Sequence, residues 1–226
     1  MIKVVFSPSW FMGIDNIFEL ITIIVTLLIA IYSWKVYKFS KESIHKYFSY
    51  AFFMISLSYI IKILMDISIY YPTTKIVQVG LLTVITHTFQ KLDIFYTVGF
   101  FVSRLLLMLG MVGIFLVLER KGDKYYAFLL VYLAFVAALF GNFLFHIFHI
   151  TTALLLLLIF IHYYNNYVEC RSRNVLLVAL SFLLIFISQI IFITVQLHPV
   201  LYVVAESVQL LGYLILLYLF ISILRK

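Results

Sequence analysis

Seven long apolar runs constrain this chain more than any other feature of its sequence. A helix of roughly 20 residues is needed to cross about 30 Å of hydrocarbon. The runs cover residues 16–33, 47–70, 94–118, 126–140, 144–163, 175–195 and 202–224. The fourth and fifth together are too long for one crossing, and Gly141 with Asn142 supplies a break between them. The sequence therefore predicts an all-α integral membrane protein, a single seven-transmembrane helix bundle over residues 1–226.

The composition excludes most other classes of protein. Apolar residues make up 65% of the 226 residues and charged residues 11%, against about 45–50% and about 25% in soluble domains. A soluble fold of this size has too little interior for so much apolar surface, which excludes a soluble enzyme and a disordered chain. The net charge of +7 lies in short clusters between the runs, so it does not indicate nucleic-acid binding. The single cysteine, Cys170, excludes an intramolecular disulfide.

The basic clusters predict the orientation of the bundle. Cytoplasmic loops carry the excess of Lys and Arg. One side of the predicted topology carries Lys35, Lys38, Lys41, Lys46, Arg120, Lys121, Lys124, Arg171, Arg173, Arg225 and Lys226, and the opposite side carries Lys3, Lys75 and Lys91. We therefore expect a multi-pass protein of the cell membrane with its N-terminus outside and its C-terminus in the cytosol.

Two segments have their own signals within this topology. Residues 71–92 are too polar to cross and form the predicted extracellular loop, whose apolar centre around Gly80 fits a hairpin or an amphipathic segment. The fourth run carries small residues at helical spacing, which predicts a close packing face. These are Ala134, Ala137, Ala138 and Gly141.

Polar residues inside the runs gather toward the predicted outer side. Charged groups at mid-membrane are costly and need a partner or a function. Two stripes at helical spacing join several of them. One is Glu19, Thr22, Thr26, Ala30 and Ser33, and the other is Tyr202, Glu206, Gln209 and Tyr213. Because lipid offers such stripes no partner, they predict an internal polar pocket that opens outward.

The charges within this predicted pocket do not balance. Lys62 and Asp66 are four residues apart and can pair on one helix, while Arg104 needs a carboxylate, for which depth favours Glu206 or Asp66. Four carboxylates face these two cations, namely Glu19, Asp66, Asp93 and Glu206. Protonation, a histidine, Lys91 or a bound cation could neutralise the excess, unless Glu19 and Asp93 are simply solvated. The predicted ligand-binding set is Arg104, Glu206, Lys62, Asp66, Gln209 and Gln189, with a structural Lys62–Asp66 ion pair as the alternative interpretation.

Two histidines offer a possible metal site. His146 and His149 are three apart, a spacing that allows two imidazoles on one ion, but a transition metal usually takes a third ligand. The alternative is that both cap the start of their helix. Haem is not expected, because His149 and His162 lie on different faces. No cofactor is predicted.

Part of the chain resembles known membrane proteins. Residues 10–62 resemble small uncharacterised seven-helix membrane proteins of archaea, through Trp10, Gly13 and Glu19, the run YSWKVYKF at 32–39, Tyr47-Phe48 and SLSYIIK at 56–62. This resemblance implies a seven-helix fold and no activity. The similarity to microbial rhodopsins is one of architecture only, because the run 202–224 lacks the retinal lysine of that family.

These observations favour recognition over catalysis. We expect a receptor-like sensor or accessory subunit that binds a small ligand or a cation, and the short loops imply that it acts through a partner protein in the cytosol or membrane. The alternative is a small transporter or proton-coupled carrier, although no pair of Gly/Pro-broken helices is evident. An intramembrane enzyme is not expected, because neither the paired-histidine zinc motif nor the nucleophile-elbow motif occurs.

Overall fold

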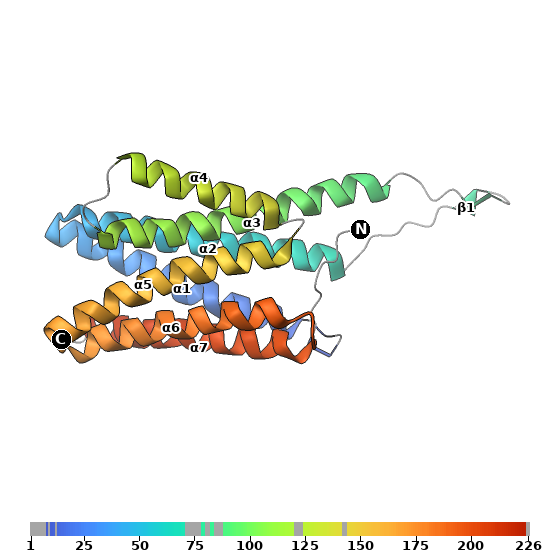
Figure 1. The fold of residues 1–226 in the computed structure, drawn as a ribbon. Helices are drawn as coiled ribbons and strands as arrows, with labels where there is room; N and C mark the ends of the chain where they lie inside the picture. Colours follow the sequence, from blue (N-terminus) through green and yellow to red (C-terminus); the bar gives the residue numbers. More distant parts are fainter. Residues whose placement is uncertain are drawn as a thin grey trace.

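Seven long helices, drawn in Figure 1, cover the seven apolar runs, and most of them extend beyond the run. The computed structural model describes residues 8, 10–11, 13–70, 78–79, 82–83, 88–119, 124–141 and 144–224. Its elements are α1 (Ile14–Ser40), α2 (Ser43–Tyr70), β1 (Gln78–Val79), β2 (Leu82–Thr83), α3 (Thr88–Glu119), α4 (Lys124–Gly141), α5 (Phe145–Cys170), α6 (Arg173–Thr194) and α7 (Val200–Leu224).

The extensions are largest at the ends of α1 and α5. The apolar runs stop at residues 33 and 163, whereas the helices continue to Ser40 and Cys170. The added segments are rich in Lys, Tyr, Glu and Asn, so apolar content does not detect them although Lys and Glu favour helices. Both helices end on a residue with a left-handed backbone, Lys41 at φ 61° and Arg171 at φ 48°. Each of these residues donates its backbone N–H to a carbonyl four residues back, which closes the last turn.

The structure describes the first of the two connections that the sequence singled out and part of the second. α4 ends at Gly141 and α5 begins at Phe145, so the fourth and fifth runs are separate helices. In the predicted loop 71–92, β1 and β2 form an antiparallel hairpin that pairs Gln78 with Thr83 and Val79 with Leu82. The last residues of that range already belong to α3.

Six of the helices form a closed ring, and α4 lies outside it. Along the ring, α1 packs against α2, α2 against α3, α3 against α5, α5 against α6, α6 against α7, and α7 against α1. α4 contacts α3 and α5 and lies along one edge of the bundle in Figure 1. Its buried residues are the small-residue face predicted above, Ala134, Ala137, Ala138 and Gly141. Small side chains allow this close approach to the ring.

Each ring helix contributes a large apolar side chain to one continuous core. These side chains are almost fully buried, and they are Ile29, Ile55, Met108, Leu156, Ile185 and Leu216. By contrast, many large apolar residues point outward, among them Phe128, Leu129 and Tyr132 of α4. Such an apolar exterior is stable against lipid and not against water.

The architecture therefore indicates a multi-pass membrane protein. Within the described residues, seven helices are long and apolar enough to cross a membrane. We call the end of the bundle that holds the start of α1 and the α6–α7 turn the N-terminal end. The opposite end, where α7 finishes, is the C-terminal end (Figure 1).

Candidate functional site

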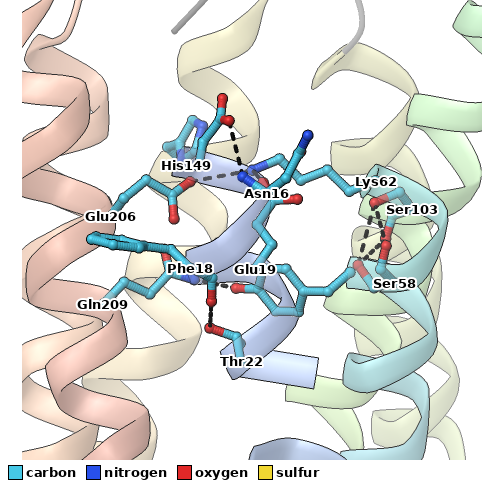
Figure 2. Close-up of polar contacts among 12 residues, drawn as sticks. Asn16, Phe18, Glu19, Thr22, Ser58, Lys62, Ser103, His149, Glu206 and Gln209 are labelled. Atoms are coloured by element: carbon cyan, nitrogen blue, oxygen red, sulfur yellow. Dashed lines mark hydrogen bonds and ion pairs between the residues drawn. The ribbon is translucent and has the colours of Figure 1, made fainter. Parts of the chain in front are cut away.

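Three charged side chains from three helices meet inside the N-terminal half of the bundle. Lys62 of α2 extends across α1 toward α7 (Figure 2). Its Nζ lies 2.5 Å from Oε1 of Glu19 on α1 and 3.3 Å from Oε1 of Glu206 on α7. One lysine therefore bridges two carboxylates. We refer to Glu19, Lys62 and Glu206 as the ion triplet.

The two predicted polar stripes bring the carboxylates of the triplet together. All members of the α1 stripe from Glu19 to Ser33 are buried, and so are all members of the α7 stripe from Tyr202 to Tyr213. α1 and α7 are neighbours in the ring, so their polar faces meet inside the bundle. The prediction that these stripes face the interior of the bundle is confirmed.

A second polar contact between α2 and α7 lies beside the triplet. Gln209 of α7 donates a hydrogen bond from Nε2 to the hydroxyl of Tyr59 on α2. The rings of Tyr59 and Tyr213 pack edge to face, with their centroids 6.2 Å apart. α2 and α7 are thus joined through side chains in the interior, although α1 separates them along the ring.

The two carboxylates of the triplet are buried to an unusual degree for charged groups. Glu19 is 1% exposed and Glu206 5% exposed, while the Lys62 side chain retains 28%. Two carboxylates against one ammonium leave one excess negative charge when all three groups are ionised. Among the described residues, no hydrogen bond reaches Oε2 of Glu19 or Oδ1 of Asn16, one turn earlier on the same helix. Buried acceptors without donors are rare, and these two are open to a donor or a cation.

Other predicted site residues form a separate polar group on α5 and α6. Nδ1 of His149 lies 2.8 Å from Oε1 of Gln189, and the imidazole stacks on Phe192 with centroids 5.0 Å apart. His149 is therefore buried among rings and hydrogen-bonded to an amide. In the part of the chain that the structure describes, no group of three His, Cys, Asp or Glu side chains could hold a metal ion. The metal site predicted at His146 and His149 thus lacks a third ligand there.

The ion pairs differ from those predicted by depth and spacing. Lys62 takes its partners from α1 and α7, and within the described residues it forms no ion pair with Asp66 on its own helix. The cation on Glu206 is Lys62, whereas depth alone predicts Arg104. The Arg104 guanidinium carbon lies 5.5 Å from the centroid of the Phe148 side chain. It also lies beside Gly141, at the outer side of the bundle where α3, α4 and α5 meet. Depth along a helix does not specify which neighbour a side chain faces.

The predicted ligand-binding set is consequently divided. Lys62, Glu206 and Gln209 come together, whereas Gln189 and Arg104 belong to other contacts. Sequence reasoning left Glu19 and Tyr59 out of this set. Glu19 begins the α1 stripe, and that position is the signal that could have identified it. Tyr59 is one tyrosine among 17, and its sequence context did not distinguish it.

No protein-family model, no curated protein and no solved structure matches this chain. The candidate site is therefore assigned from its own geometry.

Proposed function

We propose that the protein is a receptor-like membrane sensor or accessory subunit that recognises a small cation at the ion triplet. The observation that carries this proposal is the buried pair of carboxylates, Glu19 and Glu206, on a single lysine. A net negative site in a low-dielectric interior is stabilised by a further positive charge. A small cation or a proton would supply it.

The unpartnered oxygens favour a ligand that offers hydrogen bonds or direct coordination. Oε2 of Glu19 and Oδ1 of Asn16 lie on the same face of α1 and have no described donor. A hydrated or bare monovalent ion, or a small ammonium compound, satisfies both oxygens and neutralises the excess charge. An anionic ligand would instead meet a site that is already negative.

Binding of a cation at the triplet would change contacts that join three helices. The triplet joins α1, α2 and α7, and the Tyr59–Gln209 hydrogen bond joins α2 and α7 a second time. A cation that takes over one carboxylate weakens its ion pair with Lys62, so the three helices lose a shared restraint. A shift of these helices is the signal that we propose a partner protein reads.

A thermal-stability titration tests the proposal. The purified protein is titrated with Na⁺, K⁺, ammonium and methylammonium chloride at constant ionic strength, with N-methylglucamine as the replacing ion. At about 100 times its Kd, a bound cation adds about 2.7 kcal/mol to the stability of the folded state. We expect at least one of these cations to raise the midpoint of unfolding in the unmodified protein.

Two variants make the titration specific. In Glu19→Gln the excess charge is gone, so the cation effect should be lost, whereas Glu42→Gln, an exposed carboxylate outside the triplet, should retain it. A midpoint that no cation moves, or that moves equally in both variants, would contradict the proposal.

A proton-coupled carrier is the second candidate, because an excess carboxylate inside the bundle is also a site for a transported proton. Reconstituted vesicles separate the two functions. Recognition alone predicts no cation-dependent proton flux across the vesicle membrane, whereas a carrier produces a flux that Glu206→Gln abolishes.

A further inference from the structure

A cavity of about 730 Å³ lies at the C-terminal end of the bundle, opposite to the ion triplet. Five of the six ring helices line it, namely α1, α2, α3, α5 and α7. Its size is within the range of about 300–1,000 Å³ that is typical of small-molecule sites. A smaller hollow of about 360 Å³ shares Ile44 and Val117 with it and extends the space between α2 and α3.

The extension of α5 creates the polar side of this cavity. Asn166 and Glu169 lie in this extension, His162 lies just before it, and all three line the cavity. Because the apolar run stops at residue 163, the sequence did not indicate that the exposed residues Asn166 and Glu169 line a cavity. Phe48 and Phe220 line the same cavity and give it an apolar side. A polar side and an aromatic side in one cavity fit an amphipathic ligand.

The charge of the lining limits the ligand further. Among the lining residues that the structure describes, Glu169 is the one Asp, Glu, Lys or Arg side chain. A second carboxylate, Glu42, lies 3.6 Å from the lining residue His45. The ammonium of Lys35 lies over the ring of Tyr32, 5.6 Å from its centroid, at the α1 side of the cavity. On the α5 side, where Glu169 is the charged group of the described lining, a neutral or singly cationic molecule therefore fits better than an anion.

We propose that this cavity binds a neutral or singly cationic amphipathic molecule, whose apolar ring or chain lies against Phe48 and Phe220 and whose polar group meets His162, Asn166 and Glu169. The site is distinct from the ion triplet, since the two share no residue and lie at opposite ends of the bundle.

Three indole compounds that differ in charge test this proposal. The purified full-length protein in lipid nanodiscs is titrated with tryptamine, tryptophol and indole-3-acetate, and binding is measured by equilibrium dialysis. We expect saturable binding of tryptamine and tryptophol, with indole-3-acetate the weakest.

Glu169→Gln should weaken the binding of tryptamine roughly three- to fivefold and leave the binding of tryptophol unchanged. The effect is small because Glu169 is exposed and its ion pair with the ligand is screened by solvent. Glu119→Gln, an exposed carboxylate outside the lining, is the matched control.

The single cysteine provides a readout of location. Cys170 is exposed and follows Glu169 directly, so an environment-sensitive fluorophore attached there should report saturable binding of tryptamine. The same fluorophore on Leu197→Cys in a Cys170→Ser background, at the N-terminal end, should not respond. Tightest binding of indole-3-acetate, no saturable binding of any compound, or a response at position 197 alone would overturn the proposal.

Discussion

At the scale of single residues, Lys62 compensates the buried charges of the bundle interior. It is the cation that lies within 4 Å of both Glu19 and Glu206. Two buried carboxylates without that ammonium would repel each other in a medium with little water. The cost of removing a member of the triplet therefore depends on which charge is removed.

The first prediction concerns this asymmetry. Lys62→Met should lower the free energy of unfolding by about 3–5 kcal/mol, because it leaves two buried carboxylates uncompensated. Glu206→Gln should cost about 1 kcal/mol or less, since Lys62 and Glu19 remain as a neutral pair. Reversible unfolding in mixed micelles measures both, and Lys38→Met, an exposed lysine near the end of α1, should change stability by no more than about 0.5 kcal/mol. Equal losses for the lysine and the glutamate variants would contradict the asymmetry.

At the scale of elements, glycines set how closely two pairs of helices pack. A Cβ built on Gly110 of α3 would lie 2.5 Å from Cγ1 of Ile55 and 2.9 Å from the backbone oxygen of Ala51, both on α2. Gly212 of α7 is similar, since its Cβ would lie 2.6 Å from Cγ1 of Ile185 on α6. These positions allow the backbones to approach, as small residues do in membrane helices.

The second prediction tests this packing with two glycines one turn apart. Gly110→Ala should destabilise the bundle by about 1–3 kcal/mol, because its methyl group meets the α2 backbone. Gly113→Ala should cost clearly less, because its nearest neighbour is the Ala51 methyl group at 3.2 Å. Unfolding midpoints of the two variants measure the difference. A larger loss for Gly113→Ala would show that α2 and α3 pack in another register.

The helices could be predicted from the sequence much more completely than their contacts. Run length and the Gly141 break determine the helices, and the periodic stripes determine which faces of α1 and α7 are buried. Partner choice could not be predicted, because a stripe does not specify the order of helices around a ring. Depth alone predicts that Arg104 pairs with Glu206, whereas Lys62 of α2 extends past α1 to Glu206 of α7. Asn166 and Glu169 of α5 were missed because polar helix ends carry no apolar signal.

At the scale of the whole molecule, the ion triplet and the larger cavity lie at opposite ends of the helix ring. The ion triplet lies toward the N-terminal end and the larger cavity at the C-terminal end. The basic clusters, which include Lys35, Lys38 and Arg173, flank the C-terminal end. The positive-inside tendency therefore predicts that the cavity faces the cytosol and that the triplet lies nearer the outside.

The third prediction tests this orientation with the native cysteine. Cys170 should react with a membrane-impermeant maleimide only after the cells are permeabilised. Leu197→Cys, in a Cys170→Ser background, should react in intact cells, because Leu197 is 82% exposed at the α6–α7 turn. The reverse pattern of labelling would place the C-terminal end outside.

The most direct test of the account is a pair of double-mutant cycles on the ion triplet. Lys62→Met is combined with Glu19→Gln and, separately, with Glu206→Gln, and the free energies of unfolding of the single and double variants are compared. The structure predicts coupling energies of about 1–3 kcal/mol in both cycles. It also predicts none between Lys62→Met and Gln189→Leu, a buried polar residue that contacts His149 instead. Additive losses in both triplet cycles would show that the lysine does not join these carboxylates.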